Sequence, residues 1–273
     1  MSASTAIAGL QGTLPGESTV PLRFVSAASL FDGHDAAINM IRRLLQTHGA
    51  EVVHLGHNRS VADIVRAAIQ EDADAIAVSS YQGGHNEYFT YMVDMLREKG
   101  CEHIRVVVGG GGTIAPDEIA LLQRHGVERI YTPEDGRTLG LNGMVEDVFR
   151  RVRAARKPAF TPGPVSCRDP ITLARTITAL EQSAGRDGAP DALRKALGRA
   201  KHRAPVIGLT GTGGAGKSSL SDELLARFVR HFPKLQIAVV AMDPTRRRSG
   251  GALLGDRIRM NSLSSDNIFM RSL

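Results

Sequence analysis

The chain has 273 residues with a formal net charge of +6, and 42% of them are hydrophobic, which is enough for one or two domains with cores of their own. Only 4% are aromatic and there is no Trp, so a base-stacking surface for nucleic acid is not expected. The positive charge still suits anionic partners. Cys101 and Cys167 lack metal-like spacing and suit a reducing cytoplasm. No apolar run reaches the roughly 20 residues of a membrane span, and residues 1–20 predict a disordered leader rather than a signal peptide.

Residues 21–153 alternate five times between a short apolar run and a helical pattern. The apolar runs cover 22–29, 51–56, 75–80, 105–110 and 128–132. The helical patterns, with apolar residues at steps of three and four, cover 35–49, 60–73, 86–100, 115–126 and 139–152. Ser60 suits a helix N-cap, and Gly49, Gly100 and Gly126 stand where helices should stop. Five such units predict an α/β fold, a flavodoxin-like, doubly wound parallel sheet with helices on both faces.

Four loops of unusual composition follow strands of this predicted sheet. They are FDGHD after the first strand, SSYQGGH after the third, GGGGT after the fourth and TPEDG after the fifth. Ligands of open α/β sheets bind at the carboxyl ends of the strands. We therefore expect the four loops to meet at one edge of the sheet and to form the ligand site of the first domain.

Residues 154–203 are predicted to form a linker that contains helices. Three prolines within KPAFTPGP leave little room for a helix at its start. Two helical patterns follow over 170–184 and 190–202, separated by a break that contains glycine. Residues 204–273 then begin a second α/β domain, with a strand predicted at 206–211.

The most specific motif is GTGGAGKS, Gly211 to Ser218, which fits G-x-x-x-x-G-K-[ST] in full. It lies between a predicted strand and a helical pattern, as a phosphate-binding loop requires. The glycines let successive backbone N–H groups face phosphate oxygens, and the helix N-terminus adds a favourable dipole. Lys217 would neutralise the β- and γ-phosphates, and the Ser218 hydroxyl would ligate magnesium. The alternative is a glycine-rich turn with an accidental lysine.

Two carboxylates beyond this loop are candidate magnesium ligands. Asp243 ends the predicted strand LQIAVVAMD, and Asp256 lies in LLGDRIRM. A carboxylate at such a place reaches magnesium directly or through water, whereas the alternative is an aspartate that caps the next turn. Arg259 is a candidate phosphate contact, with a solvated basic loop as the competing interpretation.

The segments GLTGTGGAGKSSL, AMDPT and GGALLGDRIRM resemble the P-loop GTPases that act as chaperones for cobalamin enzymes. The resemblance implies GTP hydrolysis that gates cofactor loading, with Lys217 as the catalytic residue. It implies phosphate contacts from Gly213, Gly214, Ala215, Gly216, Lys217, Ser218 and Ser219, and magnesium bound by Ser218, Asp243 and Asp256. The guanine-selecting Asn-Lys-x-Asp element of such GTPases is absent, so GTP rests on the resemblance alone, and we expect the nucleotide domain to be truncated at Leu273.

Asp32 and His34 lie two residues apart in FDGHD, at the end of the first predicted strand. A neutral imidazole is a good ligand for cobalt, and its second ring nitrogen needs an acceptor that fixes the tautomer. Asp32 lies on the same extended stretch and can supply that acceptor. The competing interpretation is a surface or capping histidine, which is the commoner role of a lone histidine.

Residues 22–150 resemble the cobalamin-binding domain of coenzyme-dependent acyl-CoA mutases and methionine synthase, a family with Asp-x-His-x-x-Gly, Ser-x-Leu and Gly-Gly motifs. The resemblance implies that His34 binds cobalt from below and displaces the cofactor's own base, whose tail enters the sheet edge. Two positions depart from the pattern, Ala37 for the glycine and Tyr81 for the leucine.

Six further residues are predicted to line the site of the displaced tail. Ser79 or Ser80 would hydrogen-bond the buried tail base, and Tyr81 would pack on the corrin or the tail. The glycine run leaves room because no Cβ intrudes; its predicted contacts are Gly109, Gly110 and Gly111.

The order of a cobalamin domain, a linker and a GTPase resembles the fused isobutyryl-CoA mutase family. This implies an adenosylcobalamin-dependent radical interconversion of isobutyryl-CoA and n-butyryl-CoA, with GTP and Mg²⁺ as further cofactors. It also implies an acyl-CoA-binding barrel domain missing from this chain, and a homodimer in the full protein. We expect this chain alone to bind adenosylcobalamin without mutase activity. Two alternatives remain open: a cobalamin carrier or sensor with a regulatory GTPase, and a plain P-loop NTPase with a flavodoxin-like scaffold.

Overall fold

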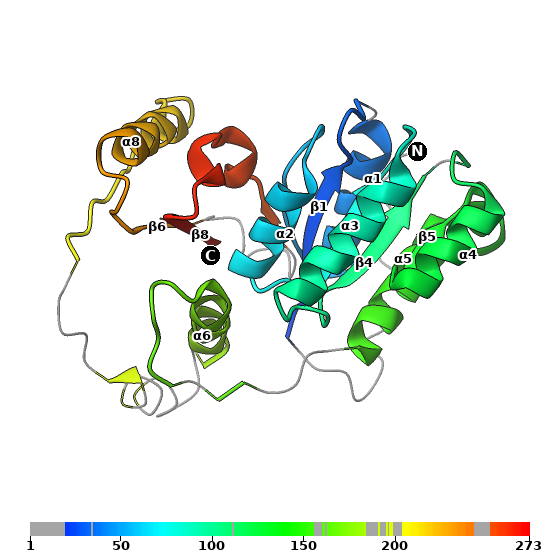
Figure 1. The fold of residues 1–273 in the computed structure, drawn as a ribbon, viewed down its shortest axis with the longest axis horizontal. Helices are drawn as coiled ribbons and strands as arrows, with labels where there is room; N and C mark the ends of the chain where they lie inside the picture. Colours follow the sequence, from blue (N-terminus) through cyan, green and yellow to red (C-terminus); the bar gives the residue numbers. More distant parts are fainter. Residues whose placement is uncertain are drawn as a thin grey trace, which may run out of the picture.

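The structure is a computed structural model, and it describes residues 20–33, 35–110, 112–155, 160–161, 163–183, 191, 195, 197–198, 204–242 and 252–273. Most of the described chain forms one parallel sheet with helices around it, and two further helices and a small sheet lie beside it (Figure 1). Among the described residues no helix has the length and apolar character needed to cross a membrane.

The main sheet has the strand order β5-β4-β3-β1-β2-β7, and every pair is parallel. Its first five strands are β1 (Arg23–Ala28), β2 (Glu51–His54), β3 (Ala75–Ser79), β4 (Arg105–Gly109) and β5 (Arg129–Tyr131). Their order confirms the predicted flavodoxin-like arrangement. Nearly every residue of β1, β2 and β3 is buried, because helices cover both faces of the sheet.

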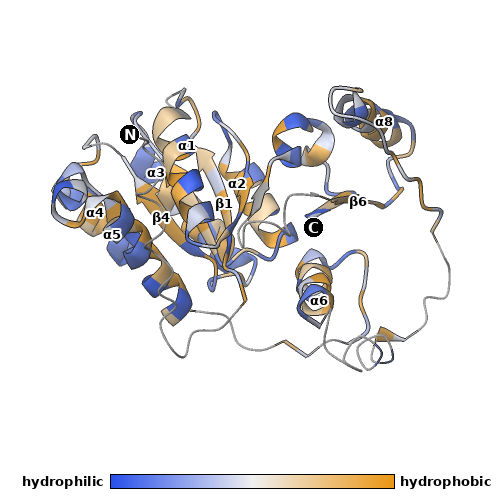
Figure 2. Ribbon diagram, turned by 180° about the vertical axis from the view of Figure 1, so that it is seen from behind, coloured by the Kyte–Doolittle hydropathy of each residue, from blue (hydrophilic) through white to orange (hydrophobic). Residues whose placement is uncertain are grey.

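Five helices alternate with these strands: α1 (Asp35–Thr47), α2 (Val61–Gln70), α3 (His85–Glu98), α4 (Pro116–His125) and α5 (Pro133–Ala154). One hydrophobic core joins α2, α3 and α4 to the sheet, and a second joins α1 and α5 to its other face. Figure 2 shows the hydrophobic strands between helices with hydrophilic outer surfaces. Ser60 caps α2 by accepting from the Asp63 N–H, as predicted.

The TPEDG segment differs from its prediction. Thr132 caps α5 by accepting from the Asp135 N–H, and Asp135 accepts from the Thr132 N–H in return. This reciprocal pair, with Pro133 at the first helical position, starts the helix six residues before the predicted 139. The helix then kinks at Gly140, whose φ is 66°.

The second half of the chain is less regular. Its described elements are α6 (Pro170–Ser183), α8 (Lys217–His231), β6 (Ile237–Ala241), β7 (Ala252–Leu254), the 3₁₀ helices η1 (Asp256–Arg259) and η2 (Ser262–Ser264), and β8 (Ile268–Ser272). β6 and β8 form a separate parallel pair. The helix predicted at 170–184 is confirmed as α6, whereas most of 190–202 lies outside the described residues.

Two features of this half differ from the sequence prediction. Residues 204–210 form no strand, and Val206 and Ile207 are exposed. An apolar run becomes a strand only where a neighbour pairs with its backbone, and β6 pairs with β8 instead. In addition, β7 pairs with β2 and so joins the sheet of the first domain.

Candidate functional site

The loops after β1 and β3 meet at the carboxyl edge of the sheet, as predicted. Asp32 is fully buried, and its Oδ2 accepts a hydrogen bond from the Tyr81 backbone N–H at 2.8 Å. The Ser29 N–H donates to the Ser79 carbonyl at 3.0 Å. These bonds join two loops whose sequence positions are about fifty residues apart, so Asp32 has a structural role in the site.

The hydroxyls of this edge differ in their partners. The Ser29 hydroxyl donates to the Ser80 Oγ at 3.1 Å, so both side chains are committed to the join between the loops. The Ser79 Oγ is buried and has no hydrogen-bond partner among the described residues. An unpartnered buried hydroxyl is costly, and Ser79 is among the residues that line a cavity.

A cavity of about 330 Å³ lies beside Ser79. Helices α1 and α5 line one side of it, and the carboxyl ends of β3 and β4 line the other. Its walls are mostly apolar. The lining residues include Ile38 and Ile41 of α1, Val107 of β4, and Leu141, Met144 and Val145 of α5. Three of the predicted residues besides Ser79 also line it, namely Tyr81, Gly109 and Gly110. A mostly apolar cavity with few polar groups is typical of a small-molecule binding site.

Gly109 and Gly110, two of the three described glycines of the GGGG run, have different roles. A Cβ on Gly109 would meet no atom within 4 Å, and Gly109 lines the cavity, so the missing side chain leaves space in the cavity open. A Cβ on Gly110 would lie 2.9 Å from the Ile114 Cδ1 and 3.0 Å from the Ser80 carbonyl oxygen. Gly110 is therefore required for packing between two loops, a reason that differs from the predicted room for a ligand.

The α5 wall of the cavity is anchored by a buried pair. The Tyr131 hydroxyl donates to the Asp147 Oδ2 at 2.8 Å, and Arg151 donates to the same oxygen at 2.8 Å. Burial opposes ionisation of Asp147, but hydrogen bonds from Arg151, Tyr131 and Arg150 outweigh it and lower the pKa of the carboxyl to about 2. Burial and the Asp147 carboxylate raise the pKa of Tyr131. The pair holds α5 against β5 beside the cavity.

Two of the residues predicted for the cobalamin site lie outside the described part of the chain, the predicted cobalt ligand His34 and Gly111. Their neighbours Gly33 and Gly110 are described, and both belong to loops of the carboxyl edge. His85, by contrast, is described and buried, and its Nε2 lies 3.0 Å from the Glu118 Oε2. Hydrogen bonds from the Ala115 N–H and from His85 lower the pKa of Glu118.

The phosphate loop leads directly into α8, which begins at Lys217. Gly211, Gly214 and Gly216 have φ of 155°, 79° and 78°, values in the left-handed region that glycine tolerates. The Lys217 ammonium donates to the Gly211 and Thr212 carbonyls at 2.8 and 2.7 Å. The lysine side chain thus connects the start of α8 with the start of the loop. The other predicted phosphate contacts, Gly213, Ala215, Ser218 and Ser219, belong to the same turn and to the first turn of α8.

The candidate magnesium ligands are described only in part. Asp243 lies outside the described residues. Asp256 begins η1 and Arg259 ends it, and η1 contacts α8. The following 3₁₀ helix is fixed to α8, because the Asp222 carboxylate accepts from the Ser262 N–H at 2.8 Å. The structure therefore brings η1, which begins at Asp256, to the helix that follows the phosphate loop.

Sequence reasoning missed the apolar half of the cavity. The residues on α1 and α5, such as Ile38, Leu141 and Val145, follow the ordinary helical pattern of a core. The early start of α5 and the kink at Gly140 add Gly136 and Leu141 to the wall. The only signal in the sequence is the pair of glycines, Gly140 and Gly143, within a helical segment.

Two family models match the chain. The model described as B12 binding domain matches residues 22–137, which cover the main sheet from β1 to β5 and the start of α5. The model described as methylmalonyl Co-A mutase-associated GTPase MeaB matches residues 173–273, which cover the phosphate loop and η1.

The chain is also similar to complete proteins. Fused isobutyryl-CoA mutases of Cupriavidus metallidurans and Geobacillus kaustophilus are 57% and 52% identical to it over 92% of the chain, which spans 23% and 24% of their length. The 2-hydroxyisobutanoyl-CoA mutase small subunit of Aquincola tertiaricarbonis is 32% identical over 40% of the chain and 79% of its own length. The chain therefore belongs to the fused isobutyryl-CoA mutase family, with a B12-binding domain followed by a MeaB-type GTPase domain.

Proposed function

We propose that residues 21–153 bind adenosylcobalamin with the displaced nucleotide tail in the cavity between α1, α5, β3 and β4, and with His34 as the lower ligand of cobalt. The observation that carries this proposal is the apolar cavity of about 330 Å³ beside the unpartnered Ser79 hydroxyl. An aromatic tail base matches both features, because its faces are apolar and its ring nitrogen accepts a hydrogen bond. Ser79 would donate that bond, while Ser80 remains engaged with Ser29.

His34 suits the cobalt by its chemistry and by its place in the chain. It follows Asp32 by two residues in the loop that the Asp32–Tyr81 bond fixes at the carboxyl edge. A neutral imidazole would bind the metal through one ring nitrogen, and a carboxylate acceptor would fix its tautomer. When bound, adenosylcobalamin would supply the radical that starts the rearrangement. The residues of this chain would hold the cofactor, orient it and exclude water from it.

We further propose that residues 204–273 contribute a GTP–magnesium site that gates cofactor loading. The loop glycines and the amides of residues 213–219 would surround the phosphates, as their left-handed φ values and the start of α8 favour. Lys217, which now donates to loop carbonyls, would transfer its hydrogen bonds to phosphate oxygens and stabilise charge during hydrolysis. Ser218, Asp243 and Asp256 would hold Mg²⁺, and Arg259 would approach a phosphate.

For the whole protein we propose the interconversion of isobutyryl-CoA and n-butyryl-CoA, which is supported by the name isobutyryl-CoA mutase that the relatives carry. An acyl-CoA-binding barrel domain outside these residues would bind the substrate, and the full protein would be a homodimer in the cytoplasm. The activity of the chain by itself is then cofactor binding rather than turnover. Measured isobutyryl-CoA turnover by this chain alone would contradict that division of roles.

Gel filtration after mixing with hydroxocobalamin tests the central proposal. We expect the visible spectrum of the corrinoid to elute with the protein, and colourless protein would refute the proposal. The His34→Ala variant should keep the fold and lose the protein nitrogen signal in the electron paramagnetic resonance spectrum of the reduced cob(II)alamin form. The matched control is His57→Ala, at an exposed histidine of the next strand–helix loop, which should keep that signal.

A further inference from the structure

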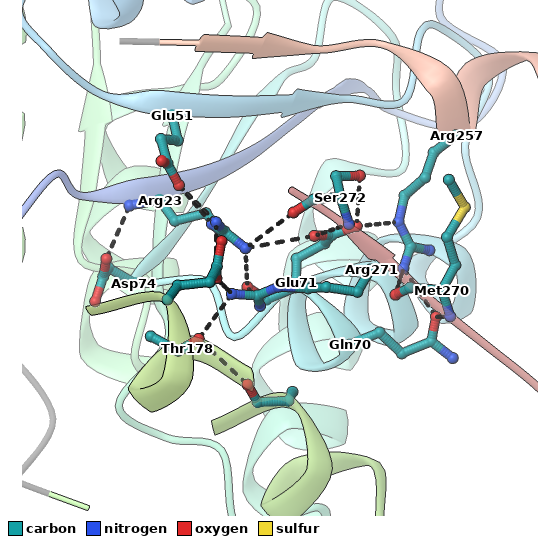
Figure 3. Close-up of polar contacts among 12 residues, drawn as sticks. Arg23, Glu51, Gln70, Glu71, Asp74, Thr178, Arg257, Met270, Arg271 and Ser272 are labelled. Carbon is teal, nitrogen blue, oxygen red and sulfur yellow. Dashed lines mark hydrogen bonds and ion pairs between the residues drawn. The ribbon is translucent and has the colours of Figure 1, made fainter. Parts of the chain in front are cut away.

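A buried cluster of charged residues joins the two halves of the chain at the end of α2 (Figure 3). Three arginines and three glutamates meet there, with the amide of Gln70 and the hydroxyls of Thr178 and Ser272. The charged members are Arg23, Glu51, Glu71, Glu181, Arg257 and Arg271. Glu71 is fully buried, so its carboxylate depends on these partners for its stability.

Glu71 anchors η1 through Arg257. The Arg257 Nε donates to the Glu71 Oε1 at 2.7 Å, and the second arm of its guanidinium donates to the Gln70 Oε1 at 2.9 Å. The other carboxylate oxygen of Glu71 accepts from the Ser272 N–H at 3.0 Å. One carboxylate of the first domain thus holds two segments of the second half.

The anchored residue stands beside a candidate magnesium ligand. Arg257 follows Asp256 directly, and both lie in η1. The segment before η1 is also fixed, because β7 pairs with β2 in parallel from Glu51 to Val53. The position of Asp256 is therefore set by the first domain as well as by α8.

Ile258, the residue of η1 that follows Arg257, packs against the loop after β2. A Cβ on Gly56 would lie 2.7 Å from the Ile258 Cδ1, and Gly56 has a φ of 86°. Only glycine fits this position without a shift, since both the close approach and the left-handed backbone exclude a larger residue. The side chain of Ile258 and the backbone of Gly56 are thus in direct contact.

The loop after β2 in turn holds the loop that carries Asp32. The Gly56 carbonyl accepts from the Ala28 N–H at 2.9 Å, and the Asn58 Oδ1 accepts from the Phe31 N–H at 2.9 Å. Phe31 and Asn58 both have positive φ, at 64° and 55°. Backbone strain of this kind persists only where surrounding contacts hold it. The contacts of η1 therefore lead, in two steps, to the loop of the proposed cobalt ligand.

We propose that η1, positioned by Arg257 on Glu71, is the element through which nucleotide at the phosphate loop changes the cobalamin loop, by way of the Ile258–Gly56 contact. This coupling rests on the proposed function, since it connects the proposed nucleotide site with the proposed cobalamin site. GTP with magnesium engages Asp256, draws η1 toward α8 and weakens the contact on Gly56. The cobalamin loop then loses a support, and cofactor affinity changes.

Ile258→Ala is the main test, because Ile258 is partly exposed and the substitution leaves the ion cluster intact. The matched control is Leu121→Ala, at an exposed apolar residue of α4, which belongs neither to η1 nor to the loop after β2. Hydroxocobalamin affinity is measured by visible titration with and without GTP–magnesium. We expect nucleotide to change the affinity of the unsubstituted chain and of Leu121→Ala about fivefold or more, an ordinary coupling strength, and to change that of Ile258→Ala less than about twofold.

Hydrogen exchange supplies a readout that needs no cobalamin. In the unsubstituted chain, GTP–magnesium should speed exchange in residues 54–60 and leave α3 unchanged. Arg257→Met should already show the fast exchange without nucleotide, and Arg257→Lys should restore part of the protection. Arg227→Met, which removes an exposed ion pair on α8, should behave like the unsubstituted chain.

The outcomes separate this proposal from the proposed function. Nucleotide binding without a change at residues 54–60, or an Ile258→Ala variant with undiminished coupling, would overturn only the role of η1. Failure to bind a fluorescent guanine nucleotide would overturn the nucleotide part of the proposed function and the coupling with it. Failure to retain cobalamin, with the exchange response present, would leave η1 as a link between a nucleotide site and a loop of another role.

Discussion

The Asp32 carboxylate accepts the backbone N–H of Tyr81 at 2.8 Å and is itself fully buried. One side chain thereby fixes the loop after β1, whose sequence continues into the candidate cobalt ligand His34, to the loop after β3. The bond gives Asp32 a role in the apo fold, in addition to the orientation of His34 that the sequence suggested.

Replacing Asp32 should separate these two roles. Asp32→Ala leaves the Tyr81 N–H without this acceptor and should lower the free energy of unfolding by about 1–3 kcal/mol. Asp32→Asn keeps an acceptor oxygen and should cost less stability, yet it removes the negative charge near His34. Urea unfolding measures the first effect and hydroxocobalamin titration the second. Equal unfolding free energies for the two variants would contradict the role of the Tyr81 bond.

Ser79→Ala should weaken cobalamin binding without harming the apo protein. The hydroxyl has no partner among the described residues, so its removal should leave the melting temperature unchanged or raise it. Loss of one hydrogen bond to the tail, about 1 kcal/mol, predicts roughly fivefold weaker binding.

The matched control for Ser79 is Ser26→Ala. The Ser26 hydroxyl lies 2.9 Å from the His54 Nδ1 in the sheet interior, away from the cavity lining. This variant should lower the melting temperature and leave cobalamin affinity within about twofold, since its bond serves the fold alone. The opposite pattern, with Ser79→Ala destabilised and its affinity intact, would show that the Ser79 hydroxyl faces no ligand.

Gly109→Ala and Gly110→Ala form a second matched pair. The new methyl at position 110 meets the Ser80 carbonyl oxygen at 3.0 Å and should cost about 1–3 kcal/mol of stability through overpacking. The methyl at position 109 meets nothing within 4 Å, so it should leave stability nearly unchanged while it narrows the cavity. We expect about tenfold weaker cobalamin binding for Gly109→Ala, measured by visible titration. Unchanged affinity would place the tail elsewhere.

Asp147 should contribute an acid-sensitive part of the stability. Its pKa in the folded protein is about 2, below the roughly 3.9 of an unfolded chain. The stabilisation is therefore complete above about pH 4 and is lost as the pH falls toward 2.

Tyr131→Phe removes one of the hydrogen bonds that lower this pKa. The variant should be less stable by about 1 kcal/mol at pH 7, and the difference should shrink near pH 2, where the carboxyl is protonated. Urea midpoints at pH 7, 4 and 2.5 measure this, with Tyr91→Phe on the exposed face of α3 as the control. A difference that stays constant with pH would refute the coupling of Tyr131 to the Asp147 charge.

The sequence by itself determined the alternation of strands and helices, because apolar periodicity is a local property that follows from burial on both faces of a parallel sheet. It also determined the phosphate loop and the loops of the carboxyl edge, since parallel strands bring their ends together whatever their order. The prediction of Ser79 as a tail contact depended on this rule, and the structure places Ser79 at the cavity.

Only the tertiary structure decided the apolar wall of the cavity, the early start of α5 and the different roles of Gly109 and Gly110. The run 206–211 is predicted as a strand from its apolar residues, and the structure shows none there. Pairing with another strand, rather than hydrophobicity alone, makes a strand. The pairing of β7 with β2 and the contacts of Glu71 with Arg257 and Ser272 join residues about two hundred positions apart. No local pattern encodes such contacts, because a buried carboxylate or a strand edge is satisfied only by partners that the folded chain brings to it.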